Sequence, residues 1–539
     1  MLNYIWLALL LLGIGTALSL DIVDQVNNKY KNGKTMQCEL ILDKADELKS
    51  QKQFSAKIKV LADTFSKFYD YKINDDFQQS CRLTYDSKTK KYAVYFTVDN
   101  ATPNFWKQMA KVNGKEEDLS GELAVQEKID SLKYTAALRL EDISFVKMKE
   151  VTNAAIDYAK TAVNIALGLI GIMALWLGIM KIGEEAGLIK KLSNAVRPVT
   201  KFLFPDVPHD HPAIGSMLMN ISANMLGLGN AATPFGLKAM EDLDTLNPNK
   251  GEATNAMCTF LVINTAGLTL IPATAIAVRA AAGSSDPAII IGTSFFGASC
   301  ATITGIISAK ILEKFYIPNF SFINWFKRNV KLIITFAGVI FVLTALVITH
   351  SFSSITFLNV DFVKRFIQLF SVIAIPAIII VFVVYAAVKK VKIYESFVEG
   401  AKEGFNVAVR IIPYLVAMLI AIGIFRAGGA MDFLVAAISP ITNLIGMPAE
   451  ALPMALMRPL SGSGSLGVMT EIISVHGPDS FIGILVSTIM GSTETTFYVL
   501  ALYFGSVNIK KTRHAVAAGL LADAAGILGA LFIVKLLFG

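Results

Sequence analysis

The stretch Met490-Gly-Ser-Thr-Glu-Thr-Thr-Phe-Tyr-Val499 decides how this chain folds. It lies within the apolar segment 480–505, which is long enough to cross a bilayer. Hydroxyl side chains and a glycine surround Glu494, and an acid at that depth is costly unless it faces protein or water. The pattern therefore predicts a helix broken near Glu494, with polar groups along a path or cavity inside a membrane-embedded fold.

The whole chain has the composition of a polytopic membrane protein. Of its 539 residues, 54% are hydrophobic and only 17% are charged. Further long apolar segments lie near residues 158–182, 254–281, 287–309, 332–349, 366–388, 408–425 and 515–538. The sequence lacks a glycine-rich phosphate loop, a zinc-ligand spacing and a basic–aromatic stripe. We therefore expect a lipid bilayer as its surroundings, and neither a cofactor nor a nucleic-acid partner.

The N-terminal part divides into a membrane helix and a polar domain. Residues 1–20 are apolar and have no basic residue before them, so they predict a first transmembrane helix, with a cleaved signal peptide as the alternative. Residues 21–150 are rich in charge and predict a small inserted α+β domain. Its expected elements are a helical pattern near 37–72 and a hairpin joining 81–85 to 92–97.

Two cysteines, Cys38 and Cys81, lie in this inserted domain. If the domain is extracytoplasmic they could form a disulfide, and two free thiols are the alternative. Elsewhere, His209 and His211 are separated by one residue but have no further ligands near them, so no metal site is expected. Asp210 is the expected helix cap there.

The rest of the chain predicts two related membrane regions, 151–316 and 393–539, joined by a linker, 317–392, with two transmembrane helices. Five residues recur 242 positions later (402 − 160): Lys160, Asn164, Gly187, Pro198 and Thr200 recur as Lys402, Asn406, Gly429, Pro440 and Thr442. Segments 212–236 and 451–475 are apolar but broken by Gly, Pro, Asn and Ser, which predicts re-entrant hairpins.

The distribution of basic residues predicts that the two repeats are inverted. Five lysines and arginines lie between positions 181 and 201, whereas the equivalent stretch 427–457 has none. Because cytoplasmic segments carry the surplus of Lys and Arg, the two stretches are expected on opposite sides of the membrane. The same rule places the N-terminus in the cytoplasm and residues 21–150 outside.

These regions resemble a known family. The phrases Phe204-Pro-Asp-Val-Pro-His-Asp-His-Pro212, Ala223-Asn-Met-Leu-Gly-Leu-Gly-Asn-Ala-Ala-Thr-Pro234 and Leu270-Ile-Pro-Ala-Thr-Ala-Ile-Ala-Val-Arg279 are similar to spore maturation protein A. Arg458-Pro-Leu-Ser-Gly-Ser-Gly-Ser465, His476-Gly-Pro-Asp479 and the stretch 490–499 are similar to spore maturation protein B. The resemblance implies an all-α polytopic permease fold of the "nucleoside recognition" Gate type in a bacterial inner membrane. It also implies a tendency to form homo-oligomers.

Polar residues in the hairpins and broken spans are the candidate binding groups. Amide and hydroxyl side chains there can read a polar ligand, or they can serve only to pack helices. The substrate-binding residues we expect are Asn220, Asn224, Asn230, Thr233, Asn264, Thr265, Arg458, Ser461, Ser463, Ser465, Thr493 and Thr495. Arg279 and Arg410 lie nearer span ends and are expected to reach the membrane interface.

Arg458 and Glu494 are the expected buried ion pair, since neither is tolerated alone in hydrocarbon. The pair could be structural, could couple transport to H⁺ or Na⁺ through Glu494, or could clamp a carboxylate-bearing solute. The leading expectation is a secondary transporter of a small polar solute such as a nucleoside, dicarboxylate or small peptide, with no enzymatic activity. The alternative is a membrane scaffold that holds an envelope partner through residues 21–150.

Overall fold

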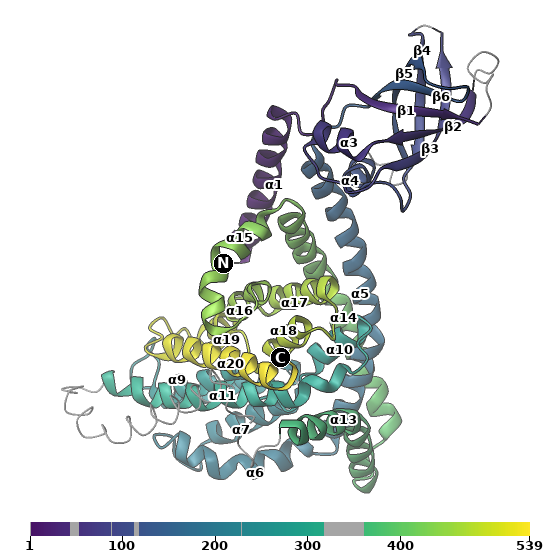
Figure 1. Cartoon of the computed structure of the whole chain (residues 1–539). Coiled ribbons are helices and arrows are strands. Elements are labelled where there is room, and N and C mark those ends of the chain that lie inside the picture. The colour runs from purple at the N-terminus through teal and green to yellow at the C-terminus, as the bar shows by residue number, and fades with distance from the viewer. Residues whose placement is uncertain (1, 44–52, 88, 113–117, 228, 317–359) are drawn as a thin grey trace. The chain divides into compact units, whose positions relative to one another are not determined.

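The computed structural model describes residues 2–43, 53–87, 89–112, 118–227, 229–316 and 360–539 (Figure 1). They divide into two units, one of residues 7–156 with 423–433 and one of the remaining described residues. Within the described residues, six helices are long and apolar enough to cross a membrane: Asn3–Val26, Val146–Glu185, Pro287–Tyr316, Ile393–Ala427, Phe481–Ser506 and Ala515–Phe538. A mostly helical, multi-pass membrane protein is thereby confirmed, while the predicted span 332–349 lies outside the described residues.

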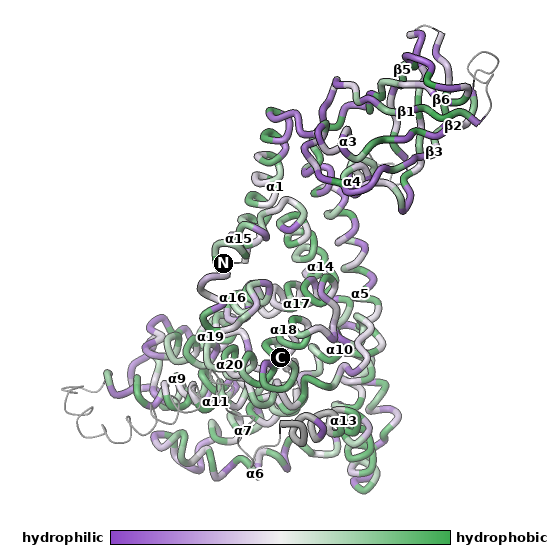
Figure 2. Tube along the Cα trace, in the orientation of Figure 1, coloured by the Kyte–Doolittle hydropathy of each residue, from purple (hydrophilic) through white to green (hydrophobic). Residues whose placement is uncertain are grey.

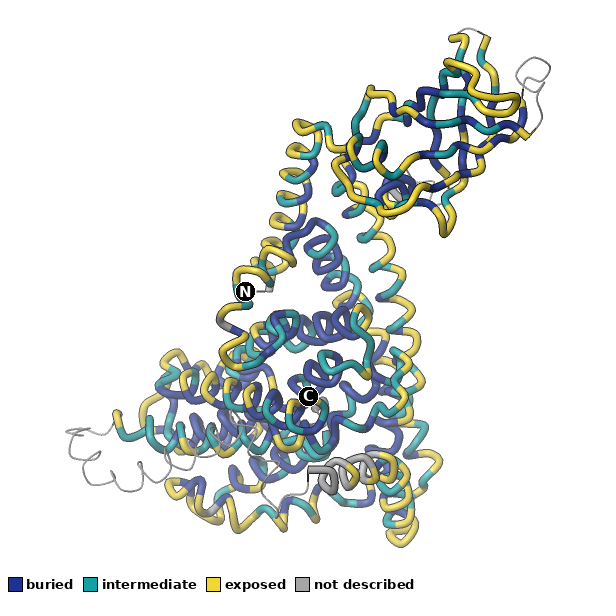
Figure 3. The backbone as a smooth tube through the Cα atoms, viewed as in Figure 1, coloured by how far each residue is buried: buried dark blue, intermediate teal, exposed yellow. Residues whose placement is uncertain are grey.

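A closed antiparallel barrel forms the polar part of the first unit. Its strands are β1 (Met36–Leu42), β2 (Gln53–Val60), β3 (Phe77–Asp86), β4 (Lys91–Thr97), β5 (Asp118–Lys128) and β6 (Lys133–Leu140). Each strand pairs with the next, and β6 pairs with β1. Alternate residues face the interior, so buried and exposed positions alternate along the strands (Figure 3).

The barrel core combines apolar side chains of the strands with aromatic side chains of two helices, α3 (Ala62–Tyr69) and α4 (Asn104–Val112). Trp106 of α4 is fully buried, with its ring centroid 5.6 Å from that of Phe65 and 5.1 Å from that of Phe96. Aromatic pairs at these separations add to the stabilisation from apolar burial. The inserted domain therefore has its own hydrophobic core.

The predicted hairpin is confirmed, because β3 pairs with β4 through the register Tyr85↔Tyr92. The predicted helical pattern near 37–72 is wrong for residues 37–42 and 53–60, which form β1 and β2, whereas Ala62–Tyr69 is helical as α3, and residues 44–52 lie outside the described part. Phe54, Ala56, Ile58 and Val60 alternate with polar residues, which is the two-residue period of a strand. The inserted α+β domain takes the form of a six-stranded barrel, with α3 and α4 as the helices among its described residues.

Cys38 and Cys81 are free thiols inside this barrel. The Cys38 thiol donates to the carbonyl of Ala136 and the Cys81 thiol to the carbonyl of Ala56, each at 3.4 Å. Burial raises the pKa of both thiols to about 12. Of the two alternatives for this pair, the structure contains the free thiols.

Asp21 joins the two helices that flank the barrel, α1 (Leu2–Val26) and α5 (Val146–Glu185). Its carboxylate is buried and accepts from the backbone N–H groups of Lys147 and Met148, at 2.8 and 2.9 Å. These N–H groups have no partner within their own helix, so Asp21 caps α5 from outside.

The second unit consists mainly of apolar helices, which Figure 2 shows in predominantly hydrophobic colours. Helices α6 (Leu188–Leu203), α7 (Pro212–Met225), α8 (Gly229–Thr245), α9 (Asn255–Ala266), α10 (Ala273–Ala281) and α11 (Ile290–Leu312) follow α5. After α13 (Val360–Val388) come α14 (Ile393–Ala427), α15 (Ala430–Ile445), α16 (Leu452–Met457), α17 (Gly462–His476), α18 (Phe481–Ser492), α19 (Thr496–Ser506) and α20 (Ala515–Phe538). Short 3₁₀ turns precede α11 and α16 and follow α11.

Two of these helices correspond residue by residue. The bounds of α15 lie 242 positions after those of α6 (430 − 188 and 445 − 203), which is the spacing of the repeated residues. The residues just before them, Gly187 and Gly429, have left-handed φ values of 82° and 84°. Each helix also contains a proline at the same position, Pro198 or Pro440. The duplication stays a prediction that this correspondence supports.

Two apolar segments are interrupted within the second unit. Helix α9 ends before Gly267, whose φ is 57°, and α10 begins after Pro272. Helix α18 ends at Ser492 and α19 begins at Thr496, so the interruption expected at Glu494 is present. The backbone groups of residues 267–272 and 493–495 are therefore outside regular helix.

Candidate functional site

The two interruptions contact each other. The backbone N–H of Glu494 donates to the carbonyl of Thr265 at 2.8 Å. A Cβ added to Gly267 would lie 2.7 Å from Cγ of Glu494, closer than real Cβ contacts come, and Gly267 also has a left-handed backbone. Glycine at position 267 thus allows the break after α9 to approach the break after α18.

A cavity of about 420 Å³ lies at this junction. It takes residues from both interruptions and from α7, α14 and α17, all within the second unit. Five of the expected site residues line it: Asn224, Arg458, Ser463, Thr493 and Glu494. Thr269, Thr274, Arg410 and Tyr414 line it as well, so the sequence-based set identifies part of the wall.

Arg458 is the buried cation of this cavity, with 2% of its side chain exposed. Its Nη2 lies 3.4 Å from Oε2 of Glu494, so the expected ion pair is present. Its Nη1 donates to Oγ1 of Thr495 at 3.2 Å, and its Nη2 donates to the carbonyl of Thr493. The guanidinium therefore holds the backbone of the second interruption and presents a positive charge to the cavity.

Glu494, by contrast, is half-exposed, with 52% of its side chain accessible. The energetic problem of an acid in hydrocarbon is solved by exposure to the cavity as well as by pairing with Arg458. An exposed ion pair is weaker than a buried one, so a ligand can compete for either partner.

The cavity wall carries more positive than negative charge. Arg410 and Arg458 line it, whereas Glu494 is the one acid among its described lining residues. The first turns of α10 and α17 also line it, and the N-terminal ends of helices carry partial positive charge. This electrostatic environment suits an anion.

Two expected asparagines, Asn220 and Asn264, hold the helices near the cavity without lining it. Nδ2 of Asn224 donates to Oδ1 of Asn264 at 2.9 Å, which ties α7 to α9. Nδ2 of Asn220 donates to the carbonyl of Ala232 at 2.9 Å and to the hydroxyl of Tyr503 at 3.2 Å. Asn220 and Asn264 are therefore buried packing residues in this structure.

Five hydroxyl residues of the expected set also lie away from the lining, among them Thr495, which accepts from Arg458. Ser461 caps α17 by accepting from the N–H of Gly464, and Ser465 donates back to the carbonyl of Ser461 at 2.6 Å. Thr265 donates to the carbonyl of Val262 at 2.9 Å. Thr233 lies in α8 outside the cavity wall. The side chain of the remaining expected residue, Asn230, is outside the described part of the chain.

Two arginines differ from the sequence-based interpretation. The side chain of Arg279 is fully buried within the protein, and its Nη2 pairs with Oδ1 of Asp479 at 2.9 Å. Its Nη2 also donates to Oγ of Ser284 at 3.0 Å. Protein groups therefore satisfy the buried guanidinium in place of water. Arg410 lies in the cavity wall.

The residue that caps α7 also differs from the expected one. Nδ1 of His211, and not Asp210, accepts from the N–H of Ala213.

Asp523 is a polar residue that the sequence reasoning missed. It lies in α20, is 1% exposed, and its Oδ2 accepts from Oγ1 of Thr496 at 2.6 Å. The signal was available, because Asp523 is the one acid in an apolar helix of 24 residues. The argument that singled out Glu494 applies equally to it.

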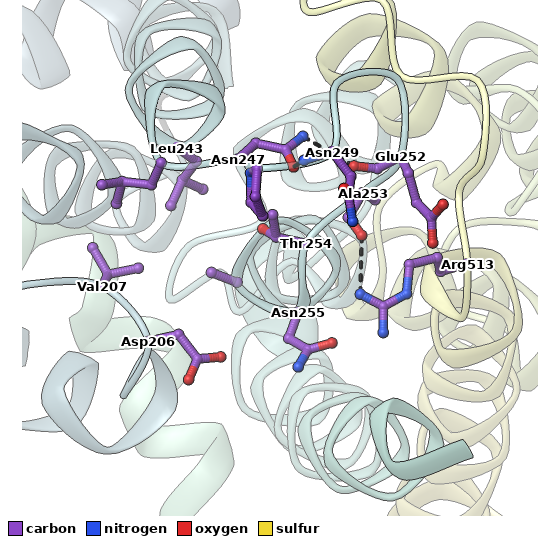
Figure 4. A pocket seen from close by; sticks show the side chains of 13 residues that line it. Asp206, Val207, Leu243, Asn247, Asn249, Glu252, Ala253, Thr254, Asn255 and Arg513 are labelled. Atoms are coloured by element: carbon purple, nitrogen blue, oxygen red, sulfur yellow. Dashed lines mark hydrogen bonds between the residues drawn. The ribbon is translucent and has the colours of Figure 1, made fainter. Parts of the chain in front are cut away.

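A second cavity, of about 290 Å³, lies where α9 begins (Figure 4). Its polar side chains include Asp206, Glu252, Asn255 and Arg513. Arg513 donates to the carbonyl of Ala253 at 3.0 Å, and Thr254 caps α9. Two acids face one arginine here and none of the expected site residues lines it, so we take the cavity at the two interruptions as the candidate site.

Comparison with known proteins gives two kinds of match. The Gate family model, described as nucleoside recognition, matches residues 166–281 and 408–510. Spore maturation protein B of Bacillus subtilis (strain 168) is 54% identical over 169 residues, covering 31% of this chain and 95% of that protein. Spore maturation protein A of the same organism is 46% identical over 169 residues, covering 31% of this chain and 84% of that protein. The Gate-matched segments include Asn224, Gly267, Arg458 and Glu494.

Proposed function

The chain belongs to the family of Gate-domain membrane proteins that includes spore maturation proteins A and B, and on this premise we propose that it is a secondary transporter of a small polar organic solute. The observation that carries the proposal is the cavity at the two interrupted helices, with Arg458 and Glu494 in its wall. Interrupted helices that offer backbone groups and helix ends to a ligand are typical of transporter binding sites.

The chemistry of the wall favours an anionic or zwitterionic solute. Two arginines and two helix N-termini face the cavity, with one carboxylate among the described lining residues. A dicarboxylate or a small peptide presents carboxylate oxygens that match an arginine fork. A nucleoside would rely on amide and hydroxyl groups such as Asn224 and Ser463, so it ranks behind the charged solutes.

The architecture we propose is a pair of inverted Gate repeats in the bacterial inner membrane. The equal lengths and the 242-residue spacing of α6 and α15 support the duplication, and the two Gate-matched segments also begin 242 residues apart (408 − 166). The uneven distribution of Lys and Arg between the two copies supports the inversion, with the N-terminus in the cytoplasm and the barrel domain outside. Substrate access would alternate between the two sides as the repeats move against each other.

Glu494 gives this transporter a way to couple the solute to H⁺ or Na⁺. Its carboxylate is paired with Arg458 at 3.4 Å. A proton or Na⁺ on Glu494 weakens that pair and leaves the guanidinium available to the anionic group of the solute. The solute and the cation then bind cooperatively, because each removes a competitor of the other.

The test is a binding screen on the purified full chain, read out as the change in melting temperature. Nucleosides, dicarboxylates and small peptides are added in Na⁺ or K⁺ and at two pH values, with Glu494→Gln in parallel. A stabilising solute whose effect depends on Na⁺ or pH, and loses that dependence in Glu494→Gln, supports coupled transport. If no solute stabilises the protein and the variant only melts earlier, the alternative becomes a scaffold that engages an envelope partner through the barrel.

A further inference from the structure

A buried carboxylate lies behind the cavity wall and lacks a partner for one of its oxygens. Asp523 of α20 is 1% exposed, and its Oδ2 accepts from Oγ1 of Thr496 at 2.6 Å. Its Oδ1 is buried without a hydrogen-bond partner within the described residues. A buried polar atom without a partner is unfavourable, and for a carboxylate the cost is larger. Binding of a proton or a cation to the Asp523 carboxylate would remove this cost.

The surroundings of Asp523 supply oxygen atoms. Gly519 and Gly526 lie on the same face of α20, one turn on either side, and let that face pack against the second interruption. A Cβ at Gly526 would lie 2.4 Å from Cγ2 of Thr493 and 3.3 Å from the carbonyl oxygen of Ser492. A Cβ at Gly519 would lie 3.3 Å from Oγ1 of Thr496 and 3.4 Å from that of Thr265. Carboxylate, hydroxyl and carbonyl oxygens are the ligands that protons and hard cations share.

The segment that packs against α20 has a second buried oxygen without a partner. Oγ1 of Thr493 is also buried without a hydrogen-bond partner in the described structure. Thr493 belongs to the interruption that α20 contacts at Gly526, and its carbonyl already accepts from Arg458. Two unpartnered oxygens on facing elements indicate a small site that is incomplete without a cation.

Charged groups near Asp523 are few. Arg458 and Glu494 act on its carboxylate with opposite sign, and both belong to the cavity wall. Helices α9, α18 and α19, which pack against α20, contain no Asp, Glu, Lys, Arg or His. Helix α11 contributes only Lys310 in its last turn, paired with Glu313 at 3.3 Å, and α13 carries Asp361, Lys364 and Arg365 in its first two turns.

We propose that Asp523, with the hydroxyls of Thr493 and Thr496, binds a cation of its own, either a proton or Na⁺, whereas Glu494 takes up its cation only together with the solute. An effect of the Asp523 cation on solute binding rests on the proposed transport function, whereas cation binding at Asp523 does not. A cation there cancels the negative charge behind Arg458, so the cavity becomes more attractive to an anionic solute. Because coupling between two binding sites is reciprocal, the solute in turn tightens the binding of the cation.

The first experiment measures the melting temperature of the full chain in lipid nanodiscs without solute. Na⁺ is titrated at pH 8 against choline at constant ionic strength, and in a second series the pH is lowered from 8 to 7 in choline. A ligand that binds the folded state raises the melting temperature, so the series that responds identifies Na⁺ or the proton. We expect the response to be lost in Asp523→Asn and kept in Glu494→Gln.

A wild-type protein that responds to neither cation, or an Asp523→Asn variant that responds as the wild type does, overturns the proposal. Loss of the response in Glu494→Gln alone also overturns it, since the cation would then sit in the cavity. If Asp523→Asn does not fold, Thr496→Val and Thr496→Ser replace it. We expect about a tenfold loss of apparent cation affinity in Thr496→Val and near wild-type affinity in Thr496→Ser. Equal affinities in these two variants would contradict the site.

The same samples separate this inference from the transport proposal. Solutes from the binding screen are added at saturating cation. A cation response that requires Asp523, without stabilisation by any solute, leaves the cation site standing and rejects the proposed function. The opposite result is also distinct. If the protein shows no cation response, but a solute stabilises it with the same affinity at saturating and at minimal cation, solute binding is supported and the role of Asp523 is rejected.

Discussion

The backbone N–H of Glu494 is hydrogen-bonded to the carbonyl of Thr265 at 2.8 Å, so each interrupted helix supplies a partner that the other lacks. The Thr265 carbonyl is close to the end of α9, where the last turn leaves carbonyls without helical partners. Glu494 follows the end of α18, in backbone that is not helical. The cavity is thus built on a contact between two stretches of main chain, and side-chain substitutions can alter its chemistry while leaving its frame in place.

Replacing Gly267 by alanine should break that frame. The new Cβ would lie 2.7 Å from Cγ of Glu494, and the φ of 57° is unfavourable for any residue with a Cβ. We expect a loss of about 1–3 kcal/mol in the free energy of unfolding and weaker solute binding. The measurement is the melting temperature with and without solute. Gly171→Ala is the control, because nothing lies within 4 Å of the added Cβ there and the glycine is helical.

Removing the guanidinium of Arg458 should weaken binding of an anionic solute. Arg458→Gln leaves Glu494 without its partner and removes the buried cation of the wall. We expect a loss of about 2 kcal/mol or more in the binding free energy, or roughly a thirtyfold rise in Kd. Arg458→Lys keeps the charge but loses the fork that reaches Thr493 and Thr495, so its Kd should lie between the two. Equal Kd values for all three proteins would exclude Arg458 from the solute site.

The Arg279–Asp479 pair should make stability sensitive to acid. Burial acts to raise the pKa of Asp479, but hydrogen bonds from Ser284 and Ser285 and the charge of Arg279 outweigh it and hold that pKa below its usual value. The folded carboxyl therefore stays ionised to lower pH than the unfolded one. Its contribution is present above about pH 4 and is lost as the pH falls further. The difference in melting temperature between wild type and Asp479→Asn should shrink from pH 5 to pH 3, and a constant difference would contradict this role.

His514, just before α20, should act in a separate pH range. Burial, followed by the charges of Arg513 and Lys310, lowers the pKa of its imidazole to about 4. An unfolded histidine titrates near pH 6.5 and takes up its proton first, so the neutral, buried ring stabilises the fold fully above about pH 6.5. That stability is lost between about pH 6.5 and 4. His514→Phe keeps a ring against Tyr316. Its melting temperature should therefore rise relative to that of the wild type as the pH falls from 7 to 4.5.

The barrel should lose stability when its central aromatic is removed. Trp106 is fully buried between α4 and the strands, so Trp106→Ala leaves a large cavity and should cost about 3–5 kcal/mol in unfolding free energy. Tyr95→Ala is the matched control, since Tyr95 lies on β4 with half of its surface exposed. Hydrogen exchange of strand amides reports the effect directly. If the amides of β3 and β4 exchange at the same rate in Trp106→Ala as in the wild type, the strands do not depend cooperatively on this core.

Sequence reasoning succeeded where a single residue broke a strong pattern. Glu494 interrupts an apolar segment, and the structure has both the break and the ion pair with Arg458. The same reasoning was not applied to Asp523, although its segment is equally apolar, because no run of hydroxyls surrounds it. The hydroxyl of Thr496 comes instead from another helix, and contacts between distant segments leave no local pattern.

The barrel and the binding residues show two further limits of sequence reasoning. Buried and exposed residues alternate strictly along 53–60. The charged residues around this stretch nevertheless resemble the polar face of a helix, and its pairing with β1 and β3 is what identifies it as a strand. Asn220 and Asn224 are four residues apart on one helix, but only Asn224 lines the cavity, because Tyr503 of α19 covers the other. Which of two equivalent amides meets a ligand depends on what packs beside them.

The cavity draws its walls from segments that are synthesised far apart in time. Asn224 and Gly267 emerge early, whereas Arg458 and Glu494 belong to a part of the chain made roughly two hundred residues later. A nascent chain that stops in the linker has one wall of the cavity and no ion pair to complete it. Carrying both walls on one polypeptide also makes their supply strictly equimolar. Neither an unfinished product nor an excess of one half can then present a complete cavity.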